Sequence, residues 1–314
     1  MQDKSTSAPT ILILGAGSIG VSFAAVFADC GAQVCLIDPD VQRRTDALAA
    51  LTVQQEAINT AGLARNGKGD VAVVEHPGER LTDADLVLEC GPENLEIKQA
   101  IFADLLAKTG PETILATTSS AITMSRIVPD EKSQRRCLVA HPVNPPAVLH
   151  VVELVPAPGT AAQTTKIAAG LFQSVGFEAV ELGHEIEGFV LNRLQGAVLR
   201  EAYRLVEEGV TDVAGVEAIM RLGLGPRWAL SGPFETAELN TPGGIKAHAA
   251  RMGPAYKRMG EARGEKVEWS EALVASVDAQ RREIVPADGL ANRAEWRARA
   301  VARLVAARDR LMQD

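Results

Sequence analysis

The chain has 314 residues, of which 46% are hydrophobic and 23% charged, and its formal net charge is −8. This length and composition predict a folded protein of about two domains and exclude a disordered or fibrous chain. The acidic charge and an aromatic content of only 4% disfavour nucleic acid as a partner, so a small molecule is expected instead.

Short apolar strands alternate with helices from Thr10 to about Leu182. The expected strands are Ile11–Leu14, Gln33–Asp38, Val71–Val74, Leu86–Cys90, Thr113–Thr117, Cys137–Ala140, Val151–Val155 and Glu178–Leu182. The expected helices are Ser18–Cys30, Val41–Ala61, Asn94–Lys108 and Ala162–Val175. Continuous apolar strands that alternate with helices are typical of a parallel sheet covered on both faces. The predicted fold class is therefore α/β, with an N-terminal doubly wound sheet of the Rossmann type.

The strand pattern stops after Gly188. Phe189–Glu208 has helical periodicity, and the rest of the chain is rich in Ala, Arg, Glu and Leu without a convincing strand. We therefore expect a C-terminal all-α domain and a boundary near Glu187. The expected division is a disordered leader at 1–9, a dinucleotide-binding domain at 10–187 and a helical substrate and dimerisation domain at 188–314.

Membrane spans and metal sites have no support in the sequence. No apolar run approaches the roughly 18 residues that cross a bilayer. The four cysteines form no CxxC pair and have no histidine at metal-ligand spacing. We interpret them as thiols in a reducing compartment, and we expect a cytoplasmic protein without a metal site or membrane association.

The most specific local pattern is GxGxxG at Gly15, Gly17 and Gly20, between the first strand and the first helix. In a dinucleotide site the first glycine permits a tight turn and the second lets the backbone approach the pyrophosphate. The third allows close packing of helix on strand. The free N–H groups at the start of the helix favour phosphate. The alternative is a glycine turn without a ligand, which the surrounding strand, helix and second strand disfavour.

Asp38 ends the second strand, 18 residues after Gly20. A carboxylate in this place can accept hydrogen bonds from the adenosine ribose, and it would repel a 2′-phosphate. The nearby Arg43 and Arg44 lie beyond Pro39, and we interpret them as part of a solvated helix. The sequence therefore predicts NAD rather than NADP as cofactor.

His141 ends another apolar strand and is followed by three prolines within five residues. Ligands of open α/β sheets bind outside the carboxyl ends of the strands, and histidine titrates near neutral pH, so His141 is a candidate base. Glu153, twelve residues later, lies within an apolar strand. A buried carboxylate needs a partner, and the His141 imidazole would be suitable. The alternative places Glu153 on an edge strand, facing water.

Several of these stretches carry a family resemblance. Residues 10–260 resemble the L-3-hydroxyacyl-CoA dehydrogenase superfamily, and within it the lambda-crystallin branch, the L-gulonate 3-dehydrogenases. The matching stretches, in order, are Gly15–Gly20, Glu89–Lys98, Thr118–Ser120, Ala140–Pro146, Val152–Pro156, Gly188–Leu194, Leu222–Trp228 and Gly232–Asn240. The resemblance implies an NAD-dependent dehydrogenase that forms a homodimer.

The resemblance also implies roles for individual residues. His141 would be the catalytic base and Glu153 its carboxylate partner, while Ser120 and Asn192 match positions that hydrogen-bond the reacting oxygen. The positions that match NAD contacts are Ser18, Ile19, Asp38, Glu93 and Lys98. Without the resemblance, Ser120 would be interpreted as a turn serine, Asn192 as a polar helix residue and Lys98 as a solvated helix charge.

Departures from the acyl-CoA pattern concern the substrate. The fatty-acid enzymes typically carry two aromatic residues after the catalytic histidine, where this chain has Pro142 and Val143, and Pro146 matches the lambda-crystallin branch. The stretch from 51 to 70 offers only Arg65 and Lys68 for the phosphates of CoA. The resemblance therefore implies a free 3-hydroxy acid, with L-gulonate oxidised to 3-dehydro-L-gulonate as the first expectation.

A free carboxylate would need one forked cation, and Arg227 in the turn Gly225–Trp228 is the candidate. The alternative is a structural arginine at a helix terminus. Other functions stay open: a 3-hydroxyacyl-CoA dehydrogenase, a carnitine dehydrogenase, or a structural protein of the crystallin type. The intact His141, Glu153, Ser120 and Asn192 disfavour the last.

Overall fold

The computed structural model describes residues 8–229, 232–240, 244–263 and 286–311, with single positions at 272, 275, 279 and 283. Contacts between Cα atoms divide the chain into two compact units. The first comprises the described residues up to Arg193 together with Arg297–Ala307, and the second comprises those in Leu194–Trp296 and after Arg308. Residues 297–307 thus belong with the first unit, although they fall within the helical domain expected at 188–314. That boundary, like the leader, stays a prediction.

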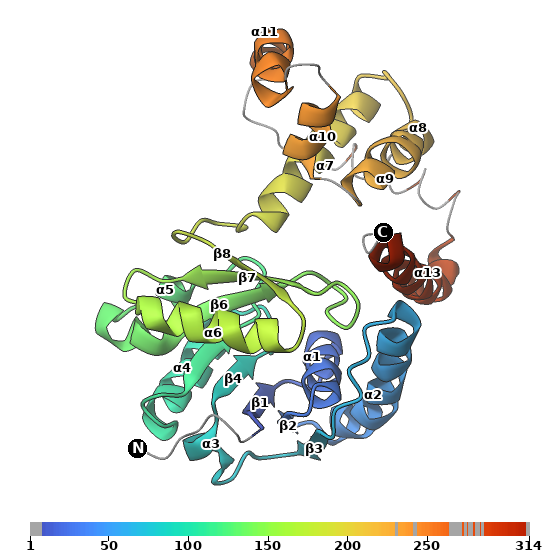
Figure 1. Cartoon of the computed structure of the whole chain (residues 1–314). Helices are drawn as coiled ribbons and strands as arrows, with labels where there is room; N and C mark the ends of the chain where they lie inside the picture. Colours follow the sequence, from blue (N-terminus) through green and yellow to red (C-terminus); the bar gives the residue numbers. More distant parts are fainter. Residues whose placement is uncertain are drawn as a thin grey trace. The chain divides into compact units, whose positions relative to one another are not determined.

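The first unit is built on one eight-stranded sheet (Figure 1). Its strands are β1 (Thr10–Leu14), β2 (Gln33–Ile37), β3 (Asp70–Val74), β4 (Leu86–Glu89), β5 (Ile114–Thr117), β6 (Cys137–Pro142), β7 (Val151–Pro156) and β8 (Glu178–Glu181). They are ordered β3-β2-β1-β4-β5-β6-β7-β8. Neighbours pair in parallel, except that β6 and β7 are antiparallel. The doubly wound α/β fold is confirmed, and the strand order reverses between β1 and β4, where such sheets bind ligands.

Helices cover both faces of this sheet. They are α1 (Ser18–Asp29), α2 (Val41–Ala61), α3 (Arg80–Asp83), α4 (Leu95–Lys108), α5 (Met124–Ile127), a 3-10 helix (Glu131–Arg136) and α6 (Ala162–Ser174). Asp40 caps α2 by accepting from the Gln42 and Arg43 N–H groups, and Asn94 caps α4 by accepting from the Ile97 N–H. These caps explain why both helices begin close to where the sequence predicts.

The core of the unit lies in two clusters. Ile11 and Ile13 belong to one and Leu12 to the other, as the alternation of side chains along a strand requires. In the first cluster Phe23 and Phe27 of α1 contact Phe172 of α6, each with ring centroids 5.8 Å apart. α6 also packs against β7 and β8 (Figure 1). Helices α1 and α6 therefore pack against each other in the same core cluster of the sheet.

The last helix, α13 (Leu290–Leu311), contributes to the first unit as well. Its residues Ala302 and Val305 form a small buried cluster with Ala61 at the end of α2 and Val148 of the loop after β6. All four side chains are at most 3% exposed. This apolar contact explains why the segment 297–307 belongs with a unit that is remote in sequence.

The described elements of the second unit are all helical, as predicted. They include most of α7 (Leu191–Glu207), then α8 (Val213–Ile219), a π-helical turn (Met220–Leu224), α9 (Gly225–Trp228), α10 (Pro233–Leu239) and α11 (Gly244–Arg263). The Arg263 guanidinium ties α11 to the end of α7 by pairing with Glu201, at 2.8 Å, and with Glu208. Within the part of the chain that the structure describes, no helix is long and apolar enough to span a bilayer.

Candidate active site

The glycine motif forms the turn between β1 and α1. Gly15 has a φ of +111°, and a Cβ there would lie 2.7 Å from the carbonyl oxygen of Cys90. A Cβ on Gly20 would lie 1.9 Å from the carbonyl oxygen of Gly15. No other residue fits these two positions, because both have backbone atoms where a side chain would begin. The turn therefore lies directly against the backbone that follows β4, and the first turn of α1 packs on Gly15.

The start of α1 fits the phosphates of a dinucleotide. The helix has no side-chain cap and no acidic residue in its first turn, so its first N–H groups face outward. A Cβ on Gly17 would meet nothing within 4 Å, which leaves room for a ligand to approach the backbone. Ser18 is exposed and Ile19 half-buried at the same end. This arrangement is what the pyrophosphate of NAD requires.

Asp38 follows β2 and is only 4% exposed. One carboxylate oxygen accepts from the Ala16 N–H at 2.8 Å, and the other accepts from the Asp40 N–H at 2.9 Å. The side chain thereby connects the glycine turn to the start of α2. Carboxylate oxygens have further lone pairs, so these bonds leave acceptor capacity for a ribose hydroxyl.

Arg44 differs from the solvated helix residue that the sequence suggested. Its Nη1 donates to the carbonyl oxygens of Asp38, at 2.8 Å, and Pro39, at 2.9 Å, and its Nη2 pairs with Glu75 at 3.3 Å. The side chain folds back along the end of β2, because the exposed carbonyl groups there need donors. The Arg44 guanidinium, which lies beside Asp38, is therefore bound by these two carbonyl oxygens and by Glu75.

His141 and Glu153 lie opposite each other on the antiparallel strands β6 and β7. The Nδ1 atom of His141 is 2.7 Å from Glu153 Oε2, and the residues are 6% and 3% exposed. β8 pairs with the other side of β7, so β7 is an inner strand and Glu153 faces the imidazole rather than water. The register of a single hairpin brings the two predicted residues together.

The second oxygen of Glu153 is held by the backbone. Oε1 accepts from the N–H groups of Val190, at 2.8 Å, and Leu191, at 3.0 Å, where α7 begins. Burial alone would raise the pKa of Glu153, but the hydrogen bonds from His141 and from these two N–H groups hold the pKa below its ordinary value. The carboxylate is thus kept ionised beside the imidazole.

Phe189 is a member of the site that the sequence analysis missed. It is fully buried, its φ is +50°, and its ring centroid lies 5.4 Å from that of His141. The preceding Gly188 also has a positive φ, of +76°. These two left-handed residues turn the chain so that the next two N–H groups face Glu153. The only sequence signal was a large apolar residue between Gly188 and the start of a helix.

Ser120 and Asn192 are also brought together. Asn192 Nδ2 donates to the carbonyl oxygen of Ser120 at 2.7 Å. Ser120 lies in the loop after β5, and its own hydroxyl is exposed and 3.4 Å from Glu93 Oε1. Because Asn192 follows Leu191 on α7, the turn that holds Glu153 also sets the position of the Asn192 amide.

Glu93 and Lys98 differ in their exposure to solvent. The Glu93 side chain is 40% exposed, whereas Lys98 is 1% exposed and so is not the solvated charge expected without the resemblance. Lys98 Nζ lies 2.8 Å from Glu89 Oε2 and 3.7 Å from Glu93 Oε2. Burial would raise the pKa of Glu93, but the Ser119 hydroxyl, the Lys98 charge and the N–H groups after Ser119 lower it. Glu89 was not among the residues predicted to be functional, although a charged residue at the end of an apolar strand is a usable signal.

Arg227 belongs to the second unit, where it is exposed on the short helix α9.

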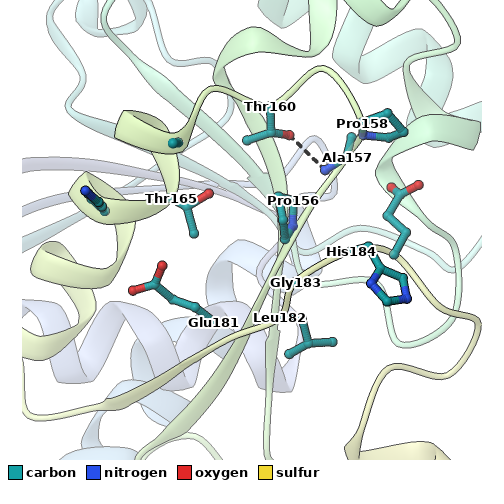
Figure 2. A pocket seen from close by; sticks show the side chains of 12 residues that line it. Pro156, Ala157, Pro158, Thr160, Thr165, Glu181, Leu182, Gly183 and His184 are labelled. Atoms are coloured by element: carbon teal, nitrogen blue, oxygen red, sulfur yellow. Dashed lines mark hydrogen bonds between the residues drawn. The ribbon is translucent and has the colours of Figure 1, made fainter.

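A hollow of about 490 Å³ lies in the first unit, between the end of β7, the start of α6 and the end of β8. Figure 2 shows Pro156, Pro158 and His184 among its lining residues, with a hydrogen bond from the Ala157 N–H to the Thr160 hydroxyl. None of the predicted site residues lines it. Among the described residues no group of His, Cys, Asp and Glu side chains could hold a metal ion.

Comparison with known proteins decides the family. The family model described as "3-hydroxyacyl-CoA dehydrogenase, NAD binding domain" matches residues 10–186. The model described as "3-hydroxyacyl-CoA dehydrogenase, C-terminal domain" matches residues 188–284. The chain belongs to the 3-hydroxyacyl-CoA dehydrogenase family. As a member of this family it is an NAD-dependent oxidoreductase that acts on a CH–OH group, which confirms the predicted cofactor and reaction class.

Similarity to individual proteins supports the predicted lambda-crystallin branch of this family. The chain is 38% identical to the lambda-crystallin homolog of Bos taurus, with the whole of both chains covered. It is 32% identical to an L-carnitine dehydrogenase of Pseudomonas sp, over 80% of this chain and 79% of the relative. A solved structure, the NAD⁺-dependent 5-formyl-3-hydroxy-2-methylpyridine 4-carboxylic acid 5-dehydrogenase, superposes with a TM-score of 0.84 at 26% identity, covering 96% and 99% of the two chains.

Proposed function

We propose that the chain oxidises the 3-hydroxyl group of a free 3-hydroxy carboxylic acid, with L-gulonate, giving 3-dehydro-L-gulonate, as the first candidate. The observation that carries the proposal is the buried His141–Glu153 pair at the carboxyl end of β6, in a member of an NAD-dependent dehydrogenase family. The similarity to a lambda-crystallin homolog over the full length of both chains supports this branch over the acyl-CoA enzymes.

His141 would act as the base. An ionised carboxylate only accepts hydrogen bonds, so the contact with Glu153 places the imidazole proton on Nδ1 and leaves Nε2 as an acceptor. Nε2 can then take the hydroxyl proton of the substrate, and Glu153 stabilises the imidazolium that forms. Ser120 and Asn192 would hydrogen-bond the reacting oxygen. Bound NAD would supply the hydride acceptor for this oxidation.

The cofactor would be held mainly by the first unit. Gly15, Gly17 and Gly20 with Ser18 and Ile19 would bind the pyrophosphate at the start of α1. Asp38 would accept hydrogen bonds from the adenosine ribose. In the expectation based on the family, Glu93 and Lys98 lie near the nicotinamide half.

The free-acid substrate rests on two arguments. Pro142 and Val143 replace the aromatic pair of the fatty-acid enzymes, and two of the similar proteins are named for the free acids carnitine and a pyridine carboxylic acid. Arg227 would bind the substrate carboxylate, because guanidinium matches carboxylate in a bidentate manner. The second candidate is a 3-hydroxyacyl-CoA thioester, which the family description itself favours.

A substrate screen tests the proposal. NADH absorbance is recorded with L-gulonate, L-carnitine, 3-hydroxybutyrate and 3-hydroxybutyryl-CoA under the same conditions. We expect turnover of a free acid, with L-gulonate giving the highest kcat/KM. Turnover of the thioester alone would overturn the free-acid proposal and favour the second candidate. Absence of turnover with every compound would instead favour a structural protein.

A homodimer is part of the same proposal. Helix α7 buries none of its residues among the described parts of the chain, and its Leu194 and Leu199 are 59% and 38% exposed. A second copy of the chain would cover such a face. Sedimentation of the purified protein should give twice the 33.3 kDa mass of one chain. A monomer at micromolar concentration contradicts this part of the proposal.

A further inference from the structure

A buried ion pair lies at the carboxyl end of β4. Glu89 is 0% and Lys98 1% exposed, and Lys98 Nζ lies 2.8 Å and 3.1 Å from the two carboxylate oxygens. Glu89 also accepts from the Gly91 N–H at 2.7 Å and from the Thr117 hydroxyl at 2.6 Å. Each oxygen of Glu89 thus has two donors, and the carboxylate has no freedom to turn.

Stability alone is a poor explanation for this pair. Two charges lose their hydration when they are buried, and apolar side chains of similar volume often give an equally stable protein. The pair also contacts a residue of the predicted site, Glu93. Glu93 contacts Lys98 directly, and Ser119 is linked to Glu89 through Thr117. A buried pair in this position fits a role in holding a particular local geometry.

Two routes of contacts lead from Glu89 to the loop that contains Ser120. On the first, Lys98 Nζ lies 3.7 Å from Glu93 Oε2. Glu93 Oε1 then accepts from the Ser119 hydroxyl at 2.6 Å and from the N–H groups of Ser120, at 3.0 Å, and Ala121, at 3.1 Å. Lys98 therefore holds one end of the Glu93 carboxylate and the loop holds the other.

The second route is shorter. The Thr117 hydroxyl donates to Glu89 Oε2 at 2.6 Å and accepts from the Ser119 N–H at 3.2 Å. Thr117 is the last residue of β5 and is fully buried. The first route ends on residues 119–121 and the second on Ser119, and both begin on the Glu89 carboxylate.

We propose that Glu89 is a positioning residue for the dehydrogenase reaction: through Lys98 and Thr117 it fixes the loop 119–121 that presents Ser120 to the substrate. The inference rests on the proposed role of Ser120. It also gives Glu93 and Lys98 a part beyond the one that the resemblance implied. Besides the expected NAD contact, they hold the loop.

Three variants separate positioning from stability. E89Q removes the nearer counter-charge of the buried Lys98 ammonium and leaves only Glu93, at 3.7 Å. It should lower the melting temperature by about 10 °C. The double variant E89L/K98M removes both charges and should recover most of that loss. R136M is the matched control. Arg136 holds the opposite end of α4 by donating to Thr109 Oγ1 and to the Gly110 carbonyl oxygen, each at 2.7 Å.

Activity is the first readout. With the substrate that the wild type oxidises, kcat should be roughly tenfold or more below wild type in both E89Q and E89L/K98M, since a misplaced group costs rate even in a folded enzyme. The dissociation constant of NADH, measured by fluorescence, should be nearly unchanged in E89Q, which keeps Lys98. R136M should lose melting temperature and keep its kcat. Wild-type kcat in the double variant, or a weakened NADH affinity with normal kcat, would overturn the inference.

Amide hydrogen exchange provides a readout that needs no substrate. The N–H groups of residues 119–121 should exchange faster in E89Q and in the double variant than in wild type, and R136M should leave them protected. Unchanged protection in both Glu89 variants sinks the inference even if kcat falls. Wild-type protein that oxidises no 3-hydroxy compound overturns the proposed function instead, and the exchange data still report on the loop.

Discussion

The two compact units differ in how much of their helices they bury. In the first unit α1 buries nine of its twelve residues. Helix α7, most of which lies in the second unit, has 17 residues and buries none. The first unit can therefore hold a reactive geometry by its own packing, whereas the second leaves its side chains available for other contacts. This contrast suggests that the chemistry depends on the first unit and that recognition depends more on the second.

The largest effect should come from the base in the first unit. His141→Asn removes the group proposed to take the hydroxyl proton, and kcat should fall by about 100- to 10,000-fold. NADH binding, followed by fluorescence, should be preserved, because the cofactor contacts are expected elsewhere in the unit. A variant with near-normal kcat would show that the acid–base chemistry does not depend on His141.

Two phenylalanines sharpen the contrast in stability. Phe189 is fully buried against His141, whereas Phe234 of α10 is 80% exposed. Phe189→Ala should lower the free energy of unfolding by about 3–5 kcal/mol, and Phe234→Ala should change it by no more than roughly 0.5 kcal/mol. Urea unfolding followed by circular dichroism measures both. Equal losses in the two variants would remove the distinction between the units.

Arg227 tests whether recognition depends on the second unit. Arg227→Leu should raise KM for the free acid by roughly tenfold, which corresponds to 1–2 kcal/mol, with a smaller change in kcat. Steady-state kinetics with the substrate found in the screen provide the measurement, and KM for NAD is the control. If KM for the acid does not change, Arg227 is a structural residue of its helix.

The smallest effect concerns pH. The pKa of Glu153 in the folded protein lies below its ordinary value of 4.5, so the ionised carboxylate stabilises the fold above that pH. This stabilisation is lost as the pH falls below 4.5 and through the lowered pKa of the folded state. In Glu153→Gln the free energy of unfolding should depend less steeply on pH in this range. Parallel urea titrations of both proteins from pH 6 down to pH 3 provide the measurement.

Much of the first unit could be predicted from the sequence, because its signals are local. The apolar strands, the glycines that admit no side chain and a histidine at a strand end lie within short stretches. Glu153 could be paired with His141 because a carboxylate inside an apolar strand requires a partner. Both residues belong to one hairpin, so few alternatives existed.

Other residues could not be predicted because their environment depends on contacts that are distant in the chain. Buried Lys98 is paired with Glu89 at the end of β4, whose carboxylate also accepts from Thr117 of β5. Phe189 contacts a histidine 48 residues earlier. The Arg44 side chain, which lies against the end of β2, pairs with Glu75, and Glu75 follows a different strand, β3. Side-chain burial of this kind is a property of the assembled sheet.

The return of the segment 297–307 to the first unit makes that unit discontinuous in sequence. A ribosome releases Ala61 and Val148 long before Ala302 and Val305, which later cover them. The apolar surface around Ala61 and Val148, here called the seam, must therefore stay uncovered in the nascent chain while residues 194–296 are synthesised. Premature termination before residue 297 would yield a dehydrogenase with every predicted catalytic residue and a permanently exposed seam, which is a substrate for chaperones or for aggregation.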